Sequence, residues 1–405
     1  MTGALVVIAP HPDDEILGAG GIMARAHGCG ERLGVIVLTD GAQSDPGICP
    51  RTLKALRADE CRAGLAELLG EVPPLLMLAY ADGQFDARHP DLAAVSLLTG
   101  FLRAIDPVTL LVTDPSDGHR DHKAAFGLAS RIVAAGLAQR LVVMPVSQRI
   151  DGAFDARGFE RRPVCDFTGA KRRAIACHHS QIGAQDGFAL SDAVCDAFAR
   201  DEYVRPVYDR NGDVGRPQAV TAEHFDSMFT RCDDPWDYQT SAYEADRFAR
   251  TIKALGGAWY STALELGCAN GVLTQMLAAH CGTIVAIDGS AAALDIAKTR
   301  LADIDNVVLK HGNLPDDLPP GDFDLIVLSD FLYYLGFAGC VDLALALQSN
   351  AAPGCRIVMA NYLGQTECAL TGDMAAEIMI AHLPGWAVTQ QQRCERLRID
   401  VLEQA

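Results

Sequence analysis

Short apolar runs alternate with longer amphipathic stretches along this chain. In the first half, the runs ALVVIA, LGVIVLT, PLLMLAY and VTLLVT are separated by segments in which apolar residues recur at helical spacing. One of these segments, residues 51–70, repeats Leu and Ala and ends in glycine, as a capped helix does. Strands of parallel sheets are buried on both faces and read as near-continuous apolar runs. The pattern therefore predicts a doubly wound α/β sheet.

A second series of the same kind follows later in the chain, with the runs ALELG, GTIVAIDGS, FDLIVLS and CRIVMANYL. Between the two series, the stretch RPVYDRNGDVGRPQAV is rich in Gly, Pro and charged residues, which is typical of a linker. A length of 405 residues also suits two domains. We therefore expect an α/β protein with two Rossmann-like doubly wound domains, residues 1–200 and 224–405, joined by a linker over residues 201–223.

Net charge, apolar runs and cysteine content limit the kinds of molecule that this chain is expected to bind. The formal net charge of −18 disfavours nucleic acid and anionic membrane surfaces, since clustered Lys and Arg dominate phosphate binding. The sequence contains no run of about 18 apolar residues, so we expect no membrane span. The N-terminus lacks the features of a secretory leader. Thirteen cysteines without a CxxC pair favour free thiols in a reducing compartment. These features predict a cytoplasmic protein that acts on a small molecule, and they indicate no oligomeric state.

The first candidate site lies in the segment HPDDE, where His11, Asp13 and Asp14 follow the first predicted strand. Open α/β sheets place ligands at the carboxyl ends of their strands. His119 and His122 follow the apolar run TLLVTDP and should emerge at the same edge of the sheet. Two histidines and one carboxylate with an open position are the donor set of catalytic zinc, and such a set also holds iron.

With its PHPDDE and HRDH segments, the first half resembles the PIG-L/LmbE family of zinc-dependent N-acetyl amino-sugar deacetylases. The likeness extends over about residues 4–181 and includes TDGAQSD, ADGQF and KRRAIACHHSQ. The resemblance implies one Zn²⁺ ion per site, held by His11, Asp14 and His122. It also implies Asp13 as the general base, His119 as the group that stabilises the oxyanion, and Asp121 as the residue that orients His119.

Further residues of the first half match motif positions of that family. Candidates for substrate contact are Arg57, Asp40, Asp82 and His178. Glu15 follows the two aspartates, and we expect it to cap or hydrogen-bond the start of the next helix, whose N-terminus favours negative charge. The family most often has a basic residue where this chain has His179.

The second candidate site begins in the segment LELGCANG, where Glu265, Gly267 and Gly271 follow a predicted strand. Glycines at such a position let the backbone approach a ligand closely. The segment is neither the GxGxxG of dinucleotide binders nor a phosphate-binding GK[ST] loop. Asp288 ends the next predicted strand about 20 residues later, where an acidic side chain can accept hydrogen bonds from ribose hydroxyls.

This arrangement resembles the class I S-adenosylmethionine-dependent methyltransferases. More narrowly it is similar to the NodS family, the N-methyltransferases of deacetylated chitooligosaccharides, through DPWDYQTSAYEADRF, LELGCANG, FDLIVLSDFLYYL and TGD. The resemblance implies that Gly267 and Gly271 flank the methionine part of the donor, with Glu265 beside them.

The same resemblance assigns the remaining contacts. Asp288 would bind the ribose and Asn313 would lie near the adenine, while Trp236 and Arg247 on the preceding helix would close over the donor. Asp330 and Tyr334 would line the acceptor site. The family tends to have a His-Trp pair where this chain has Asn361 and Tyr362, so the acceptor contacts differ.

Amide hydrolysis exposes the amine that an N-methyltransferase needs. The sequence therefore predicts a bifunctional enzyme that deacetylates an N-acetylated amino sugar or its conjugate and then methylates the freed nitrogen, with Zn²⁺ and S-adenosylmethionine as cofactors. Two alternatives stay open. The first is a hydrolase of a non-sugar N-acyl amide joined to an O- or N-methyltransferase with a different substrate. The second is a chain in which one half is a non-catalytic binding or regulatory module.

Overall fold

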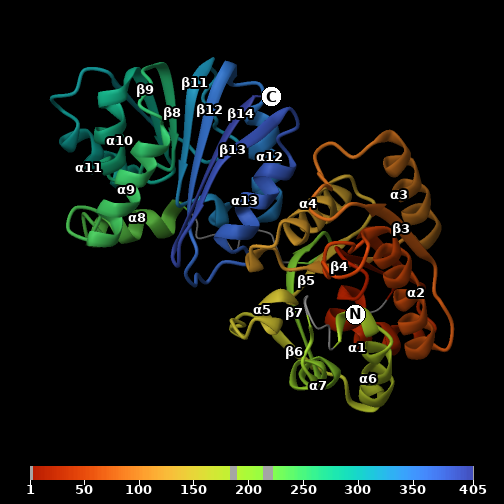
Figure 1. Ribbon diagram of the computed structural model, residues 1–405. Coiled ribbons are helices and arrows are strands. Elements are labelled where there is room, and N and C mark those ends of the chain that lie inside the picture. The colour runs from red at the N-terminus through yellow and green to blue at the C-terminus, as the bar shows by residue number, and fades with distance from the viewer. Residues whose placement is uncertain (1–2, 183–188, 213–221, 405) are drawn as a thin grey trace. The chain divides into compact units, whose positions relative to one another are not determined.

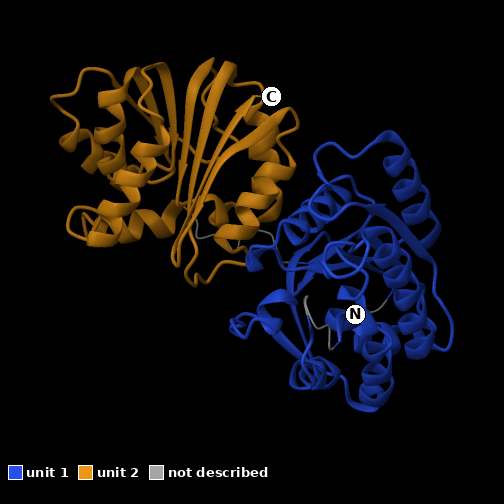
Figure 2. Ribbon diagram, in the orientation of Figure 1, with its two compact units in different colours: residues 1–213 blue, residues 214–405 orange. Residues whose placement is uncertain are grey.

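The computed structural model describes residues 3–182, 189–212 and 222–404. The chain divides into two compact units, unit 1 (Met1–Asp213) and unit 2 (Val214–Ala405), which Figure 2 shows in separate colours. None of the helices within the described ranges is both long enough and apolar enough to cross a membrane.

Unit 1 is built on a seven-stranded sheet with the order β3-β2-β1-β4-β5-β7-β6. Strands β1 to β5 run parallel, β7 pairs antiparallel with β5, and β6 pairs antiparallel with β7. The strands are β1 (Leu5–Ala9), β2 (Leu33–Thr39), β3 (Leu75–Tyr80), β4 (Thr109–Thr113), β5 (Arg140–Met144), β6 (Glu160–Pro163) and β7 (Asp201–Asp209). The α-helices are α1 (Asp14–Gly28), α2 (Pro50–Leu69), α3 (Leu92–Ile105), α4 (Arg120–Ala134), α5 (Ser147–Ile150), α6 (Thr168–Ala176) and α7 (Asp192–Arg200).

Unit 2 has a sheet with the order β10-β9-β8-β11-β12-β14-β13, in which β14 and β13 are the antiparallel strands. Figure 1 shows α9, α10 and α11 on one side of this sheet and α12 and α13 on the other. The strands are β8 (Tyr260–Leu266), β9 (Cys281–Asp288), β10 (Val307–His311), β11 (Phe323–Ser329), β12 (Ala351–Tyr362), β13 (Trp386–Arg393) and β14 (Leu397–Gln404). The α-helices are α8 (Ala222–Arg231), α9 (Ala242–Ala254), α10 (Val272–Leu277), α11 (Ala291–Arg300), α12 (Gly336–Leu347) and α13 (Gly372–Ala381).

The two sheets share one topology, because numbering the strands of each unit separately gives the same order, 3-2-1-4-5-7-6. In both units the strand order reverses between the first and fourth strands, which are β1 and β4 in unit 1 and β8 and β11 in unit 2. Such a switch point opens a crevice at the carboxyl ends of the strands. Each candidate site begins directly after these two strands.

The predicted α/β fold is confirmed. Each apolar run quoted above coincides with one of the strands β1 to β4, β8, β9, β11 or β12. The predicted helix over residues 51–70 is α2, which ends at Leu69, and Gly70 caps it with a left-handed backbone (φ +81°). Strands such as β1, β2 and β4 are buried along their whole length, so an apolar run suffices to locate them.

The start of the predicted linker is wrong. Asp201–Asp209 form β7, which pairs with β5 and β6 inside the sheet of unit 1. Within this strand, the buried residues are Glu202, Val204 and Val207, and the others are partly or fully exposed. The strand therefore lacks a continuous apolar run and resembles a linker in composition. Of the remaining linker residues, 213–221 lie outside the described ranges, and α8 begins at Ala222.

Strand β7 also supports α1 through a buried ion pair. Glu202 accepts hydrogen bonds from the backbone N–H groups of Gly21 (2.6 Å) and Ile22 (2.9 Å) in the middle of this helix. Lys171 of α6 forms an ion pair with Glu202 and donates to the Leu17 carbonyl (2.8 Å). Both charged side chains are almost fully buried. The pair thus fixes the helix whose first residue, Asp14, belongs to the candidate metal site.

Candidate active sites

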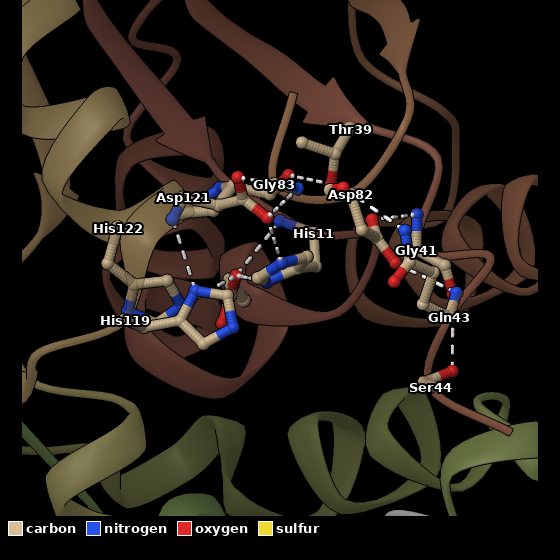
Figure 3. A network of polar contacts seen from close by, with 12 residues as sticks. His11, Thr39, Gly41, Gln43, Ser44, Asp82, Gly83, His119, Asp121 and His122 are labelled. Atoms are coloured by element: carbon tan, nitrogen blue, oxygen red, sulfur yellow. Dashed lines mark hydrogen bonds and ion pairs between the residues drawn. The ribbon is translucent and has the colours of Figure 1, made fainter. Parts of the chain in front are cut away.

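The first site is assembled at the switch point of unit 1. His11 lies in the turn after β1, and Asp14 is the first residue of α1. His119 is the N-cap of α4, and His122 lies in the first turn of that helix after β4. Figure 3 shows the three imidazoles gathered beside Asp121. The sequence prediction that the two segments meet at one edge of the sheet is confirmed.

Three predicted ligands converge with distances that suit one cation. His11 Nδ1 lies 3.1 Å and His122 Nε2 lies 3.6 Å from the same Asp14 oxygen, Oδ2. Tetrahedral zinc with ligand bonds of about 2.0–2.2 Å spaces its ligands about 3.4 Å apart. The donor atoms of all three residues lie within 4.8 Å of one another. The donor set fits a divalent cation.

Each histidine predicted to be a ligand contacts a second carboxylate through the ring nitrogen that faces away from Asp14. His11 Nε2 lies 3.1 Å from Asp121 Oδ2, and His122 Nδ1 lies 2.5 Å from Asp117 Oδ2. One nitrogen of each ring is thereby directed at Asp14. A carboxylate behind a histidine fixes the ring and raises its basicity at metal sites. Asp117 was not predicted, although its position five residues before His122 in DGHRDH was a usable signal.

The charges of the site depend on one another. Burial alone lowers the pKa of His11, but hydrogen bonds to Asp121 and Asp14 raise it to about 10. Burial opposes ionisation of Asp14 too, yet the positive charge of His122 and contact with His11 bring its pKa well below the ordinary value. The carboxylates therefore hold protons on the imidazoles. A divalent cation would replace these protons with its own charge.

The predicted general base is held by a buried arginine. Arg57 Nη2 lies 3.0 Å from Asp13 Oδ2, and Arg57 also donates to the carbonyls of Gly41 (3.0 Å) and Pro12 (3.3 Å). A Cβ atom at Gly41 would lie 2.3 Å from Arg57 Nη1, and the backbone there is left-handed (φ +62°). Glycine is therefore required at this position if Arg57 is to reach Asp13.

Glu15 hydrogen-bonds the start of α1, as expected. Its Oε2 accepts from the Asp13 N–H (3.0 Å), and the Cys61 thiol donates to its Oε1 (3.2 Å). Burial and the negative charge of Asp13 raise the pKa of Glu15 to about 8. The three consecutive acids are therefore compatible, because each has a different partner and Glu15 is mostly protonated at neutral pH.

Asp121 differs from its predicted role of orienting His119. Its carboxylate contacts His11 and accepts from the Gly83 N–H, whereas His119 Nδ1 accepts from the backbone N–H of Asp121 (3.2 Å). A ring nitrogen of His119 and a carboxylate oxygen of Asp121 still lie within 4.8 Å of each other. His119 is exposed as a residue, but its ring is partly desolvated by its neighbours. This desolvation, together with the charges of His122 and His11, lowers its pKa.

A cavity of about 670 Å³ opens over these residues. Arg57 and Asp82 line it, and Asp82 also accepts from the N–H groups of Gly41 and Gln43 (both 2.9 Å). The predicted ligands and catalytic residues line it as well: His11, Asp13, Asp14, His119, Asp121 and His122. Lining residues that the sequence analysis missed include Leu17, Gln43, Ser44, Arg120, Ile150 and Gln181.

Two residues predicted to contact substrate do not line this cavity. His178 is buried against Gly64 of α2 and does not line the cavity, but it is near enough to Asp13 and Arg57 for their charges to act on its pKa. Its contact with substrate stays a prediction. Asp40 is likewise outside the lining, and it pairs with Lys54 of α2 (3.2 Å).

The second site is a cavity of about 870 Å³ at the switch point of unit 2. Its lining includes Gly267 after β8, Asp288 at the end of β9 and Asn313 after β10. Asp288 accepts from the N–H groups of Ala269 and Ser290 (both 2.8 Å), and burial raises its pKa. These predicted donor-binding residues do lie together.

Aromatic side chains form much of the cavity wall. Trp236 stacks on Tyr238, with ring centroids 5.6 Å apart, and also lies against Phe225 and Phe229 of α8. Trp236 sits in the turn before α9 and not on a helix, which corrects the prediction. Further aromatic lining residues are Tyr243, Phe331, Tyr333, Tyr334 and Tyr362.

Three predicted donor contacts do not line this cavity. Gly271 has a left-handed backbone (φ +79°), and a Cβ there would lie 3.1 Å from Ala297 and Leu301 of α11, so this glycine serves helix packing. Arg247 is buried and ion-paired with Glu244. Glu265 is also buried, and burial raises its pKa to about 8.

The predicted acceptor residues Asp330 and Tyr334 both line the cavity. Tyr362 joins them there, and its hydroxyl accepts from Arg396 (3.0 Å). Its neighbour Asn361 is fully buried and is not part of the lining. Adjacent residues of β12 point to opposite faces of the sheet. Of Asn361 and Tyr362, which replace the His-Trp pair of the family, Tyr362 therefore lines the cavity and Asn361 does not.

Comparison with known proteins gives a separate result for each unit. Residues 6–133 match the PIG-L family, described as GlcNAc-PI de-N-acetylase, and residues 227–349 match the NodS family, described as nodulation protein S. The chain joins a PIG-L domain to a NodS domain. The predicted resemblance to both families is confirmed. The PIG-L match contains His11, Asp14 and His122, and the NodS match contains Asp288 and Asp330.

Individual relatives cover parts of the chain. Nodulation protein S of Bradyrhizobium diazoefficiens is 34% identical over 106 residues, which are 25% of this chain and 50% of that protein. Nodulation protein S of Sinorhizobium fredii is 29% identical over 154 residues, 37% of this chain and 71% of that protein. The chain thus spans about half the length of the first of these relatives.

Two solved structures are also similar. N-methyltransferase NodS from Bradyrhizobium japonicum WM9, in complex with S-adenosyl-l-homocysteine, is 21% identical with a TM-score of 0.42, over 45% of this chain and 97% of that chain. N,N'-diacetylchitobiose deacetylase from Pyrococcus horikoshii is 20% identical with a TM-score of 0.39, over 50% of this chain and 82% of that chain.

Proposed function

We propose that this chain is a bifunctional enzyme. Its PIG-L domain would remove the acetyl group from an N-acetylated amino sugar or its conjugate, and its NodS domain would transfer a methyl group from S-adenosylmethionine to the freed amine. The observation that carries the first step is the pair of histidines that are each backed by a carboxylate and directed at Asp14. Such an arrangement serves a metal site better than a surface turn.

His11, Asp14 and His122 would hold the metal ion, with zinc as the expected metal. A bound divalent cation lowers the pKa of its water to about 7 and polarises the acyl oxygen. Asp13 would take a proton from the attacking water, with Arg57 holding its carboxylate in place. His119, exposed at the cavity, would hydrogen-bond the oxyanion that forms. The C–N bond then breaks, the amine nitrogen receives the proton, and acetate and a free amine leave.

For the second step, Asp288 and the backbone around Gly267 would hold the donor. Asp288 lies at the end of β9, where an acidic side chain can accept hydrogen bonds from ribose hydroxyls. The donor carries an electrophilic methyl group on a sulfonium sulfur. Asn313 would contact the adenine, and Trp236 with its aromatic neighbours would cover the donor and exclude water. Positioning and desolvation supply most of what methyl transfer to an amine requires.

Mass spectrometry of products tests the proposal. The purified protein, with zinc and S-adenosylmethionine, would be incubated with N-acetylglucosamine, N-acetylated chitooligosaccharides and a set of non-sugar N-acetyl amides. We expect loss of acetyl followed by gain of methyl on at least one amino sugar. Deacetylation of the non-sugar amides alone, or methylation of hydroxyl groups alone, would contradict the proposal.

A further inference from the structure

Asp330 occupies an unusual backbone position at the wall of the NodS cavity. It follows β11 directly and has a left-handed backbone (φ +63°), which few residues other than Gly, Asn and Asp adopt readily. Its N–H donates to the Ala360 carbonyl of β12 (2.8 Å), which fixes this conformation. The backbone therefore holds the carboxylate against the cavity.

The two oxygens of Asp330 have different surroundings. Oδ1 accepts from the Tyr362 N–H (2.6 Å) and from the Tyr333 hydroxyl (3.2 Å). Among the described residues, Oδ2 makes a single polar contact, with Arg247 Nε at 3.5 Å. That distance is too long for a strong hydrogen bond. Oδ2 thus keeps the capacity to accept a hydrogen bond from a ligand.

Arg247 places a positive charge beneath this carboxylate. Its Nε donates to Glu244 Oε2 (2.7 Å), and its guanidinium lies 4.4 Å from the centre of the Phe248 ring. Burial raises the pKa of Asp330, and the charge of Arg247 opposes that rise. The arginine predicted to contact the donor instead lies behind Asp330.

Aromatic rings surround the same region. Tyr334 lies 4.6 Å from Tyr333 and 5.1 Å from Phe225, measured between ring centroids, and all three residues line the cavity. Aromatic faces attract cations, most strongly where water is excluded. A carboxylate oxygen that lacks a short hydrogen bond and lies beside aromatic rings suits a group that becomes positively charged as it reacts.

We infer that Asp330 Oδ2 accepts an N–H from the acceptor amine and stabilises the positive charge that moves onto that nitrogen during methyl transfer. This inference rests on the proposed N-methylation. The nitrogen lone pair forms the new N–C bond, the C–S bond breaks with its electron pair staying on sulfur, and the positive charge passes from sulfur to nitrogen. The proton remains on the product ammonium and is lost to solvent after release. A fixed negative charge beside the nitrogen favours the transition state over the neutral amine.

The test compares wild type with Asp330→Asn on glucosamine and chitosan oligosaccharides as amine acceptors. Asparagine tolerates the left-handed backbone and keeps an oxygen acceptor, so the substitution removes mainly the charge. Asp342→Asn is the matched control, since Asp342 is an exposed carboxylate on α12 outside the cavity lining. Calorimetry with S-adenosylhomocysteine reports on whether the donor site of each variant is intact.

We expect kcat for amine methylation to fall about 100-fold in Asp330→Asn, with unchanged S-adenosylhomocysteine affinity and with Asp342→Asn equal to wild type. Equal rates for Asp330→Asn and wild type would overturn the inference and leave the proposed function standing. A wild-type protein that binds the donor but methylates no amine would refute the proposed methylation and the inference with it.

Discussion

Asp117 and His122 are joined by the contact that defines the candidate metal site most sharply. The Asp117 carboxylate lies 2.5 Å from Nδ1 of the imidazole, while Nε2 on the opposite side lies 3.6 Å from Asp14. This contact decides which nitrogen of His122 is available to a metal. Asp117 therefore has a measurable role although it is not itself a predicted ligand.

Replacing Asp117 with Asn tests that role. The amide cannot carry the charge that raises the basicity of His122, so we expect the zinc dissociation constant to rise about 10- to 100-fold. Competition with a chromophoric chelator measures this constant. Asp166→Asn, at an exposed carboxylate near α6, should leave it unchanged. An unaltered zinc affinity in Asp117→Asn would show that the contact does not support the site.

Gly41→Ala should impair deacetylation without removing any polar group. The new Cβ would meet Arg57, and the left-handed backbone adds a strain of about 1–2 kcal/mol. Gly70→Ala is the matched control, since Gly70 is also left-handed (φ +81°) and has open space around it. We expect kcat for deacetylation to fall at least 10-fold in the first variant alone. Similar losses in both variants would mean that backbone strain, and not the position of Arg57, is responsible.

Removing one partner of the buried Lys171–Glu202 ion pair should lower the stability of the fold strongly. Lys171→Met leaves Glu202 buried without its cation, and we expect this to cost about 3–5 kcal/mol in the free energy of unfolding. Adding Glu202→Gln removes the stranded charge and should restore part of the loss. Urea denaturation of wild type, Lys171→Met and the double variant measures both effects. A double variant less stable than Lys171→Met would contradict this account.

Glu265 predicts a pH dependence of stability in the donor-free protein. Its pKa is about 8 in the folded state because of burial, against 4.5 for an exposed carboxyl. Between these values the unfolded chain ionises while the folded chain stays protonated, so Glu265 makes stability fall as the pH rises, by about 1.4 kcal/mol per pH unit. Glu265→Gln should abolish this contribution. The urea midpoint should therefore fall more between pH 5 and pH 8 in wild type than in the variant. An equal fall in both proteins would refute the prediction.

The fold, and the convergence of the predicted metal ligands, follow from the sequence for one physical reason. His11 and His122 follow apolar runs that become β1 and β4, and adjacent parallel strands deliver their carboxyl ends to one edge. Direction of individual side chains does not follow from such patterns. Gly271 and Arg247 stand in the right motifs, but packing keeps them out of the cavity lining. His178 is buried near Asp13 and Arg57 without lining the first cavity. The antiparallel strands β7 and β14 were not predicted because neither carries a continuous apolar run. Strand β7 is only partly buried, and the buried charged residues Arg398 and Asp400 interrupt the run in β14.

The most direct measurement of the central claim follows one nitrogen through both steps. An N-acetyl amino sugar labelled with ¹⁵N would be incubated with the full chain, zinc and S-adenosylmethionine, alongside Asp13→Asn, and tandem mass spectrometry would locate the methyl group. We predict that wild type gives a product with methyl on the ¹⁵N that lost acetyl, and that Asp13→Asn gives it only when the free amine is supplied. Deacetylated product that never acquires a methyl group, or methylation of a different atom, would contradict the account.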